Sequence, residues 1–184
     1  AGSTPMPLRQ DAMVVCARIV EATHEVALNH APLAVSTVGL VEVRPNSRNV
    51  IPGSVFFTVD LRHPEDAVLR RMEEEFRAAV DWAAGDMGLK VTVVNNWSSP
   101  SVKFDEACLG AVRTAAGDLG YRHRDIVSGA GHDAVCISWV APATMIFIPC
   151  EHGISHSEEE KTEPEHLTAG ANVLLVAVMA HDNT

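Results

Sequence analysis

The sequence is short of basic residues. Its 184 residues include 14 Lys and Arg against 24 Asp and Glu, which gives a formal net charge of −10 at pH 7. Nucleic acids and anionic membranes attract excess positive charge, so this balance argues against both as partners. The short acidic run at 158–160 is expected to be a solvated turn and not a binding tail.

The chain also lacks paired cysteine motifs, a signal peptide and a long apolar span. Its four cysteines lie far apart with no Cys-x-x-Cys, which argues against a zinc ribbon and against a dithiol redox motif. Buried free thiols suit a reducing compartment, so we expect a cytoplasmic protein. The apolar run 169–180 is too short to cross a bilayer. There is no Gly-x-Ser-x-Gly, and Ser128 has no partner base at a recognisable spacing, so a serine nucleophile is not predicted.

An initiator methionine is also absent, because the chain begins Ala-Gly-Ser-Thr-Pro-Met. We therefore expect a fragment of a longer protein. Apolar residues make up 47% of the chain, which is enough for a sizeable core in one or two domains.

Hydrophobic periodicity in the first half predicts helices and strands in a definite order. Apolar residues three or four apart predict a helix over 8–29, and β-branched alternation predicts a hairpin of strands 35–43 and 50–62. A second helix is expected from Pro64, followed by a strand at 89–94. With a short extended start, this order is most of a ferredoxin-like β-α-β-β-α-β arrangement. An unrelated α+β module stays an alternative.

The second half alternates helix and strand after a polar junction at 95–102. The expected elements are a helix capped by Asp105, a turn at 128–134, a buried strand at 144–148 and a last helix opened by a Thr162–Glu165 capping box. A buried strand of this kind needs parallel neighbours, which this half does not supply. We therefore expect a sheet completed by residues elsewhere.

Two histidines, His132 and His156, each follow a glycine-bearing turn on either side of that apolar strand. Glycine lets a backbone approach a ligand closely, and neutral imidazole binds metals or carries protons. Glu151, His152 and His156 are all candidate metal ligands at the end of the strand. One histidine does not define a site that needs roughly three or four ligands, so a surface or capping role for His156 stays open.

Asn49 and Arg62 form a second candidate site on either side of Val-Ile-Pro-Gly. A guanidinium at a strand end suits bidentate binding of a carboxylate. The simpler alternatives are that Arg62 pairs with Asp60 or Glu65 and that Asn49 is a turn residue.

The segment 129–134 also fits a loose Gly-x-Gly-x-x-Ala dinucleotide pattern, with Glu151 standing 20 residues after Gly131. The preceding segment, 121–127, is largely charged and does not suit a buried parallel strand. Hydride transfer is therefore disfavoured.

Five motifs occur together and in order: Gly-Ser-Thr-Pro-Met (2–6), Arg-Pro-Asn-Ser-Arg-Asn-Val-Ile-Pro-Gly (44–53), Phe-Thr-Val-Asp-Leu-Arg (57–62), Ser-Gly-Ala-Gly-His-Asp-Ala (128–134) and Ile-Pro-Cys-Glu-His-Gly-Ile-Ser-His-Ser (148–157). Together they resemble the N-carbamoyl-L-amino-acid hydrolase, allantoate amidohydrolase and β-ureidopropionase group of M20-type metallo-amidohydrolases. The resemblance covers essentially the whole chain.

The resemblance implies an α/β metallopeptidase-like catalytic domain that is interrupted by a smaller lid domain. Residues 1–98 resemble most of the ferredoxin-like lid, and residues 99–184 resemble the C-terminal part of the catalytic domain. It further implies a homodimer formed through the lid.

The same resemblance assigns roles to residues. His156 matches a metal ligand, Asn49 and Arg62 match residues that hold the substrate carboxylate, and Gly131 and His132 match a substrate-contacting turn. In the family a divalent metal pair, of zinc, manganese, cobalt or nickel, polarises the amide carbonyl and activates water for a glutamate base. That glutamate and the other ligands are expected upstream of residue 1. We therefore expect no catalytic residue in this chain, an incomplete metal site, and no activity unless the N-terminal half is supplied as a partner.

The activity implied is hydrolysis of the carbamoyl or ureido C–N bond of N-carbamoyl-L-amino acids or allantoate-like substrates. An M20-type aminoacylase or dipeptidase, and an isolated non-catalytic dimerisation module, stay as alternatives. The sequence does not decide the substrate or the metal.

Overall fold

The computed structural model describes residues 1–182, and the chain divides into two compact units. The first unit comprises residues 1–101, and the second begins at Val102. The sequence places a boundary at residue 98. The assignment of the two units to a lid and to part of a catalytic domain stays a prediction.

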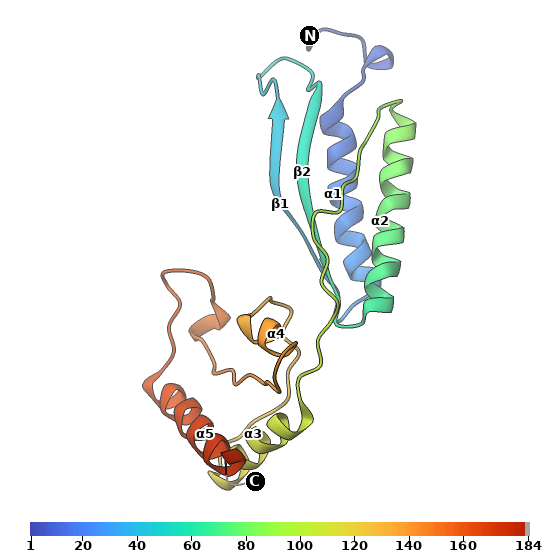
Figure 1. The fold of residues 1–184 in the computed structure, drawn as a ribbon. Coiled ribbons are helices and arrows are strands. Elements are labelled where there is room, and N and C mark those ends of the chain that lie inside the picture. The colour runs from blue at the N-terminus through green and yellow to red at the C-terminus, as the bar shows by residue number, and fades with distance from the viewer. Residues whose placement is uncertain (183–184) are drawn as a thin grey trace. The chain divides into compact units, whose positions relative to one another are not determined.

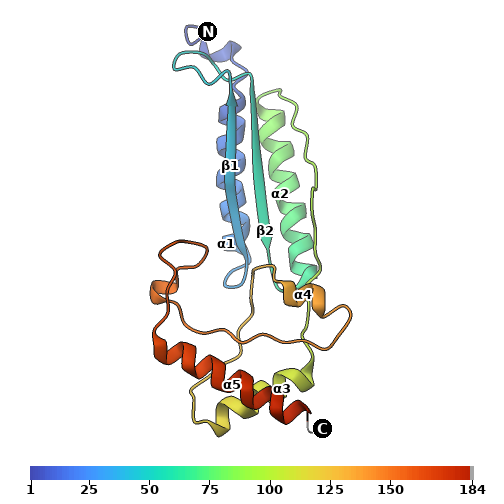
Figure 2. The same cartoon turned by 60° about the vertical axis from the view of Figure 1, so that its left-hand side comes forward.

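The first unit contains two long helices beside an antiparallel hairpin (Figures 1 and 2). Its elements are the 3-10 helix η1 (Met6–Leu8), α1 (Ala12–Asn29), β1 (Val35–Arg44), β2 (Ser54–Arg62) and α2 (Asp66–Asp86). The hairpin register pairs Val35 with Arg62 and Arg44 with Ser54. The predicted helices and hairpin are confirmed, with α1 starting four residues later than expected.

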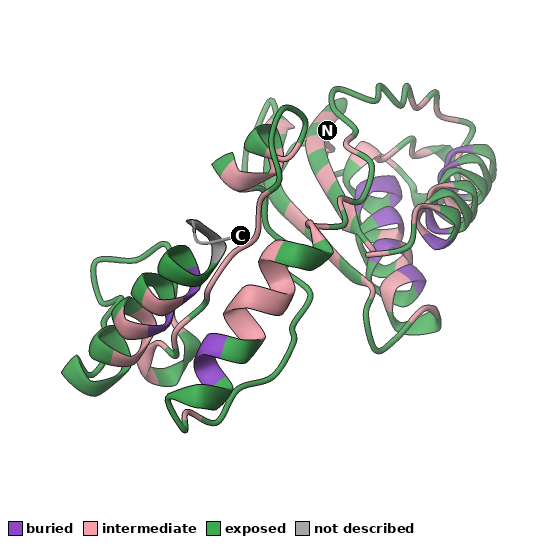
Figure 3. Ribbon diagram, turned by 60° about the horizontal axis from the view of Figure 1, so that its bottom comes forward, coloured by how far each residue is buried: buried purple, intermediate pink, exposed green. Residues whose placement is uncertain are grey.

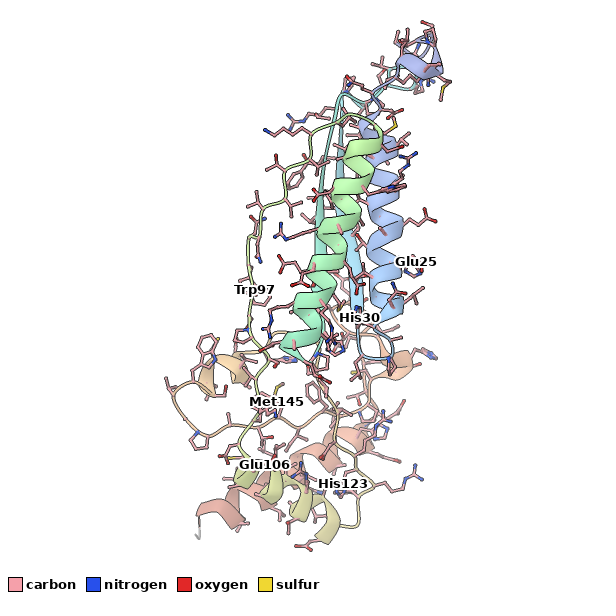
Figure 4. All side chains as sticks on the ribbon, turned by 90° about the vertical axis from the view of Figure 1, so that its right-hand side faces the viewer. Glu25, His30, Trp97, Glu106, His123 and Met145 are labelled. Carbon is pink, nitrogen blue, oxygen red and sulfur yellow. The ribbon has the colours of Figure 1, made fainter. Side chains whose placement is uncertain are left out.

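The core of the first unit lies where α1 and α2 meet one face of the hairpin. Ile19 of α1 and Met72 of α2 are fully buried. Along β2 burial alternates, and Phe57, Val59 and Leu61 pack against this core while the residues between them are exposed, as a period of two requires. Figure 3 shows the buried residues of this unit on the helices. A polar contact joins the same helices, because His30, labelled in Figure 4, lies 2.9 Å from the Glu75 carboxylate.

The predicted strand at 89–94 is not formed as a strand within the described residues. Leu89 and Val91 are half-buried against the core, but backbone N–H groups from 90 to 100 make no ladder to β1 or β2 among residues 1–182. A strand requires a hydrogen-bonded neighbour as well as an extended backbone. The described sheet therefore has two strands. The fold is mixed α and β, and the full ferredoxin-like arrangement is not confirmed.

The second unit is built on two packed helices. Its elements are α3 (Glu106–Asp118), the short α4 (Asp133–Ile137), the 3-10 turn η2 (Glu151–Gly153) and α5 (Pro164–Asp182). Ala115 and Ala116 of α3 pack against Val173 and Ala177 of α5. The predicted Asp105 cap is confirmed, because its Oδ1 accepts a hydrogen bond of 2.9 Å from the Cys108 N–H.

Two elements predicted for this unit are not formed within the described residues. Residues 144–148 form no strand in the described structure, because no neighbouring segment pairs with them. The Thr162 capping box is absent, because the Thr162 hydroxyl donates to the Pro149 carbonyl at 2.5 Å. Helix α5 starts at Pro164, whose fixed φ suits a first helical position.

A membrane-crossing helix is not found among the described residues.

Candidate functional site

The loop that carries His156 is closed at its base by three contacts. The Glu151 N–H donates to the Lys161 carbonyl at 2.8 Å, and the Lys161 ammonium lies 2.6 Å from the Glu151 carboxylate. The hydrogen bond from Thr162 to Pro149 lies next to them. These contacts therefore hold residues 151–161 as one closed loop, which precedes α5 in the chain.

His156 occupies a left-handed backbone conformation, with φ of 57°, and so does His152, with φ of 55°. This region costs non-glycine residues energy and often marks functional positions. The Glu160 carboxylate accepts the His156 backbone N–H at 2.8 Å, which holds the strained turn in place. The His156 residue is exposed.

A metal-holding group is not assembled by the described residues. No set of three or more His, Cys, Asp or Glu among them is placed to hold a metal ion. Glu151 is instead paired with Lys161 and lies 3.5 Å from His152. The candidate set of Glu151, His152 and His156 therefore does not fit a metal pair by itself, and the role of His156 as a metal ligand stays a prediction.

The turn before α4 places His132 against two other side chains. Its Nε2 lies 3.0 Å from the Ser128 hydroxyl, and its ring meets Phe147 edge-on at 5.6 Å between centroids. No partner base for Ser128 is predicted from the sequence, and in the structure His132, four residues later, lies beside it. Helical periodicity does not reveal this pair because a glycine-rich turn separates the two residues. Gly131 is exposed, and an added Cβ there would meet no atom within 4 Å.

Arg62 ends β2 with its guanidinium on Asp60. Its Nε lies 3.1 and 3.0 Å from the two carboxylate oxygens, and its Nη2 lies 2.5 Å from one of them. The hydrogen bond to Asp60 raises the pKa of Arg62, so the cation is permanent. The surface pairing with Asp60 that the sequence left open is therefore present, and it fixes the direction of the fork.

Asn49 lies at the other end of the hairpin from Arg62. Its carbonyl accepts the Gly2 N–H at 2.8 Å, and it belongs to the connection between β1 and β2. The nine residues of β2 separate this connection from Arg62 by roughly 27 Å at the usual rise of a strand. One chain therefore does not bring Asn49 and Arg62 together.

The family model for peptidase family M20/M25/M40 matches residues 4–180. The chain belongs to this family. It is 44% identical to an N-carbamoyl-L-amino-acid amidohydrolase of Rhizobium meliloti over 97% of the chain and 43% of that relative. An allantoate amidohydrolase of Bacillus subtilis is 33% identical over 95% of the chain and 42% of its own length.

Solved structures show the same relationship. A hydantoinase/carbamoylase family amidase from Burkholderia multivorans superposes with a TM-score of 0.91 at 53% identity, covering 98% of this chain and 44% of the amidase. The chain thus spans less than half the length of the relatives it matches. The predicted family membership is confirmed.

Proposed function

We propose that this M20-family chain forms part of an amidohydrolase that cleaves the carbamoyl C–N bond of N-carbamoyl-L-amino acids or the ureido C–N bond of allantoate. The observation that carries the proposal is its similarity, over nearly all of its length, to relatives named for these activities. Hydrolysis of a carbamoyl group consumes water and gives the amino acid, carbon dioxide and ammonia.

Arg62 supports the proposal because these substrates carry a free carboxylate. A guanidinium binds a carboxylate through parallel, charge-assisted hydrogen bonds. Asp60 already holds the Arg62 fork in one orientation, which reduces the entropy lost when a ligand binds. A substrate carboxylate then shares this cation with Asp60 or displaces it.

Gly131 and His132 support a second contact to the substrate. No described residue fills the space beside Gly131, since a Cβ added there would meet no atom within 4 Å. We assign this space to the substrate, with the His132 imidazole beside it as a hydrogen-bonding group.

The positions of Asn49 and Arg62 support a homodimer. If both residues bind one small carboxylate, they come from two different chains, because β2 separates them by roughly 27 Å within one chain. The dimer is therefore part of the proposal, with each substrate site taking Asn49 from one copy and Arg62 from the other. Sedimentation of the purified chain at several concentrations tests it.

In this proposal the metal pair takes its other ligands from outside this chain, since the described residues assemble no metal-holding group. This chain would contribute His156, and the bound pair would polarise the scissile carbonyl and activate water. We accordingly propose that the chain alone is inactive and that the remainder of the catalytic domain is its partner.

A chimera tests the function. In the chimera, this chain replaces the matching region of the Rhizobium meliloti relative. Ammonia release is measured with N-carbamoyl-L-amino acids and with allantoate. Amine release is measured with N-acyl amino acids and with dipeptides. We expect turnover of a carbamoyl or ureido substrate. Arg62→Lys should raise KM for that substrate at least about tenfold, because Lys lacks the bidentate fork. Arg77→Lys, on an exposed pair with Glu73, is the matched control and should leave KM unchanged.

Two outcomes would overturn the proposal. Turnover restricted to N-acyl amino acids or dipeptides would favour the aminoacylase or dipeptidase alternative. A folded, dimeric chimera without activity on any substrate would favour the non-catalytic module.

A further inference from the structure

Ser128 makes two hydrogen-bonding contacts in the described structure. Its hydroxyl oxygen accepts the Ala130 backbone N–H at 3.3 Å and lies 3.0 Å from His132 Nε2. A serine hydroxyl has one proton to donate and lone pairs to accept. With the Ala130 N–H on one of its two acceptor positions, the oxygen can still donate its proton to Nε2 or accept a proton from it.

The direction of this hydrogen bond determines which ring nitrogen of His132 carries the proton. A ring nitrogen that accepts a hydrogen bond carries no proton in the neutral side chain, so the proton resides on the other nitrogen. If the Ser128 hydroxyl donates to Nε2, His132 carries its proton on Nδ1. Within residues 1–182, Nδ1 makes no hydrogen bond with another residue.

The Phe147 contact fixes the plane of the ring. The two rings meet at 64° with centroids 5.6 Å apart, an edge-to-face geometry that aromatic pairs favour. The contacts with Ser128 and Phe147 together define the direction in which Nδ1 points. The described residues provide no carboxylate on Nδ1, so the pair lacks the third member of a nucleophilic triad.

We propose that Ser128 is a positioning residue that fixes His132 as the Nδ1–H tautomer, so that the imidazole presents a hydrogen-bond donor to an oxygen atom of the substrate. The part of this inference that concerns substrate rests on the proposed function. The part that concerns the tautomer does not.

Nuclear magnetic resonance tests the tautomer on the 184-residue chain. Long-range ¹H–¹⁵N spectra of ¹⁵N-histidine-labelled protein above pH 8 distinguish protonated from bare ring nitrogens, and His132→Gln identifies the His132 signals. We expect a bare Nε2 and a protonated Nδ1 in the native chain. Ser128→Ala should shift the proton toward Nε2, Ser128→Thr should retain the native pattern, and Ser138→Ala, which removes a hydroxyl bonded to Val135, should change nothing.

A native His132 with its proton on Nε2, or a tautomer unchanged by Ser128→Ala, would overturn the inference. Far-ultraviolet circular dichroism of each variant verifies that the helices persist. A shifted tautomer is then not a result of unfolding.

Kinetics of the chimera test the role toward substrate. Ser128→Ala should raise KM about fivefold, the size expected for one weakened hydrogen bond, with kcat nearly unchanged, and Ser128→Thr should restore KM. If the chimera is active and its KM is unchanged by Ser128→Ala, the positioning role is refuted while the proposed function stays intact. A chimera inactive on every substrate, with the native tautomer still dependent on Ser128, would instead refute the proposed function.

Discussion

The two units bury their apolar side chains in different ways. In the first unit, α1, α2 and the hairpin enclose residues such as Ile19, Met72 and Phe76 between them. In the second unit, the buried side chains belong to α3 and α5 and are mostly alanine, while Leu174, Leu175 and Val178 of α5 are more than half exposed. The first unit therefore closes its core with its own elements, and the second leaves one helix face uncovered among the described residues.

The difference shows how an amphipathic pattern depends on its neighbours. Helix α2 presents one apolar face, and that face is covered. Helix α5 is apolar around more of its circumference, which is typical of helices with protein on several sides. We therefore expect the second unit to gain stability from further protein contacts, in line with the proposed partner, and the first unit to be stable without them.

The largest expected effect is on stability of the first unit. Ile19→Ala should lower the free energy of unfolding by about 3 kcal/mol, because it leaves a cavity in a fully enclosed core. Leu174→Ala, on the exposed face of α5, should cost less than about 0.5 kcal/mol. Urea denaturation followed by circular dichroism measures both, and similar costs at the two positions would contradict the comparison.

Backbone N–H groups should also be better protected from hydrogen exchange in the first unit than in the second. Within the described residues, N–H groups from 144 to 150 donate no hydrogen bond, whereas β2 is paired along its length with β1. We expect hydrogen–deuterium exchange at 145–148 at least about 100-fold faster than at 56–61. Slow exchange at 145–148 in a dilute sample would show that this segment is paired, against the structure described.

Matched helix caps give a smaller effect. Asp11 accepts the Met13 N–H at 3.0 Å, and Asp105 accepts the Cys108 N–H at 2.9 Å. Replacing either with Ala should cost about 1 kcal/mol, and Asn should restore most of it. We expect Asp105→Ala to reduce helicity more, because α3 has fewer packed neighbours than α1. Equal losses of ellipticity for the two variants would argue that the units are alike.

The smallest effect concerns two carboxylates. A hydrogen bond from the Ser101 backbone lowers the pKa of Asp66, and hydrogen bonds from Arg113 lower the pKa of Asp125. The pKa of each carboxyl is lower in the folded chain than in the unfolded chain. Each carboxylate therefore stabilises the folded state above its unfolded pKa, and this stabilisation disappears as the pH falls through the folded pKa. Salt screens the exposed Arg113 pair. We expect 1 M NaCl to raise the pKa of Asp125, with a smaller change at Asp66, in carboxyl NMR titrations.

Local patterns predicted the elements whose partners lie within the same pattern. The three-or-four spacing located α1 and α2, and alternation located the hairpin. The segments 89–94 and 144–148 have strand-like sequences. A strand also needs a second segment that pairs with it, and the local sequence does not reveal whether that segment is present. Thr162 illustrates the same limit, because its hydroxyl bonds a carbonyl thirteen residues away and not its own helix.

The candidate site was predicted unevenly for a related reason. His132 and His156 stood out because glycine marks their turns, and Arg62 because it ends a strand. The Ser128–His132 bond, the Asp60–Arg62 pair and the distance between Asn49 and Arg62 depend on how turns and the hairpin place residues in space. The assignment of roles came from resemblance to the family, which carries information that composition and periodicity do not.

The left-handed backbone at His156 affects how its role is best examined by mutagenesis. Alanine at this position would remove the imidazole and also disfavour the conformation, so a loss of function would have two causes. Asparagine and glycine tolerate the same conformation. His156→Asn and His156→Gly are therefore the substitutions that separate the shape of the loop from the chemistry of its side chain, and the same choice applies to His152.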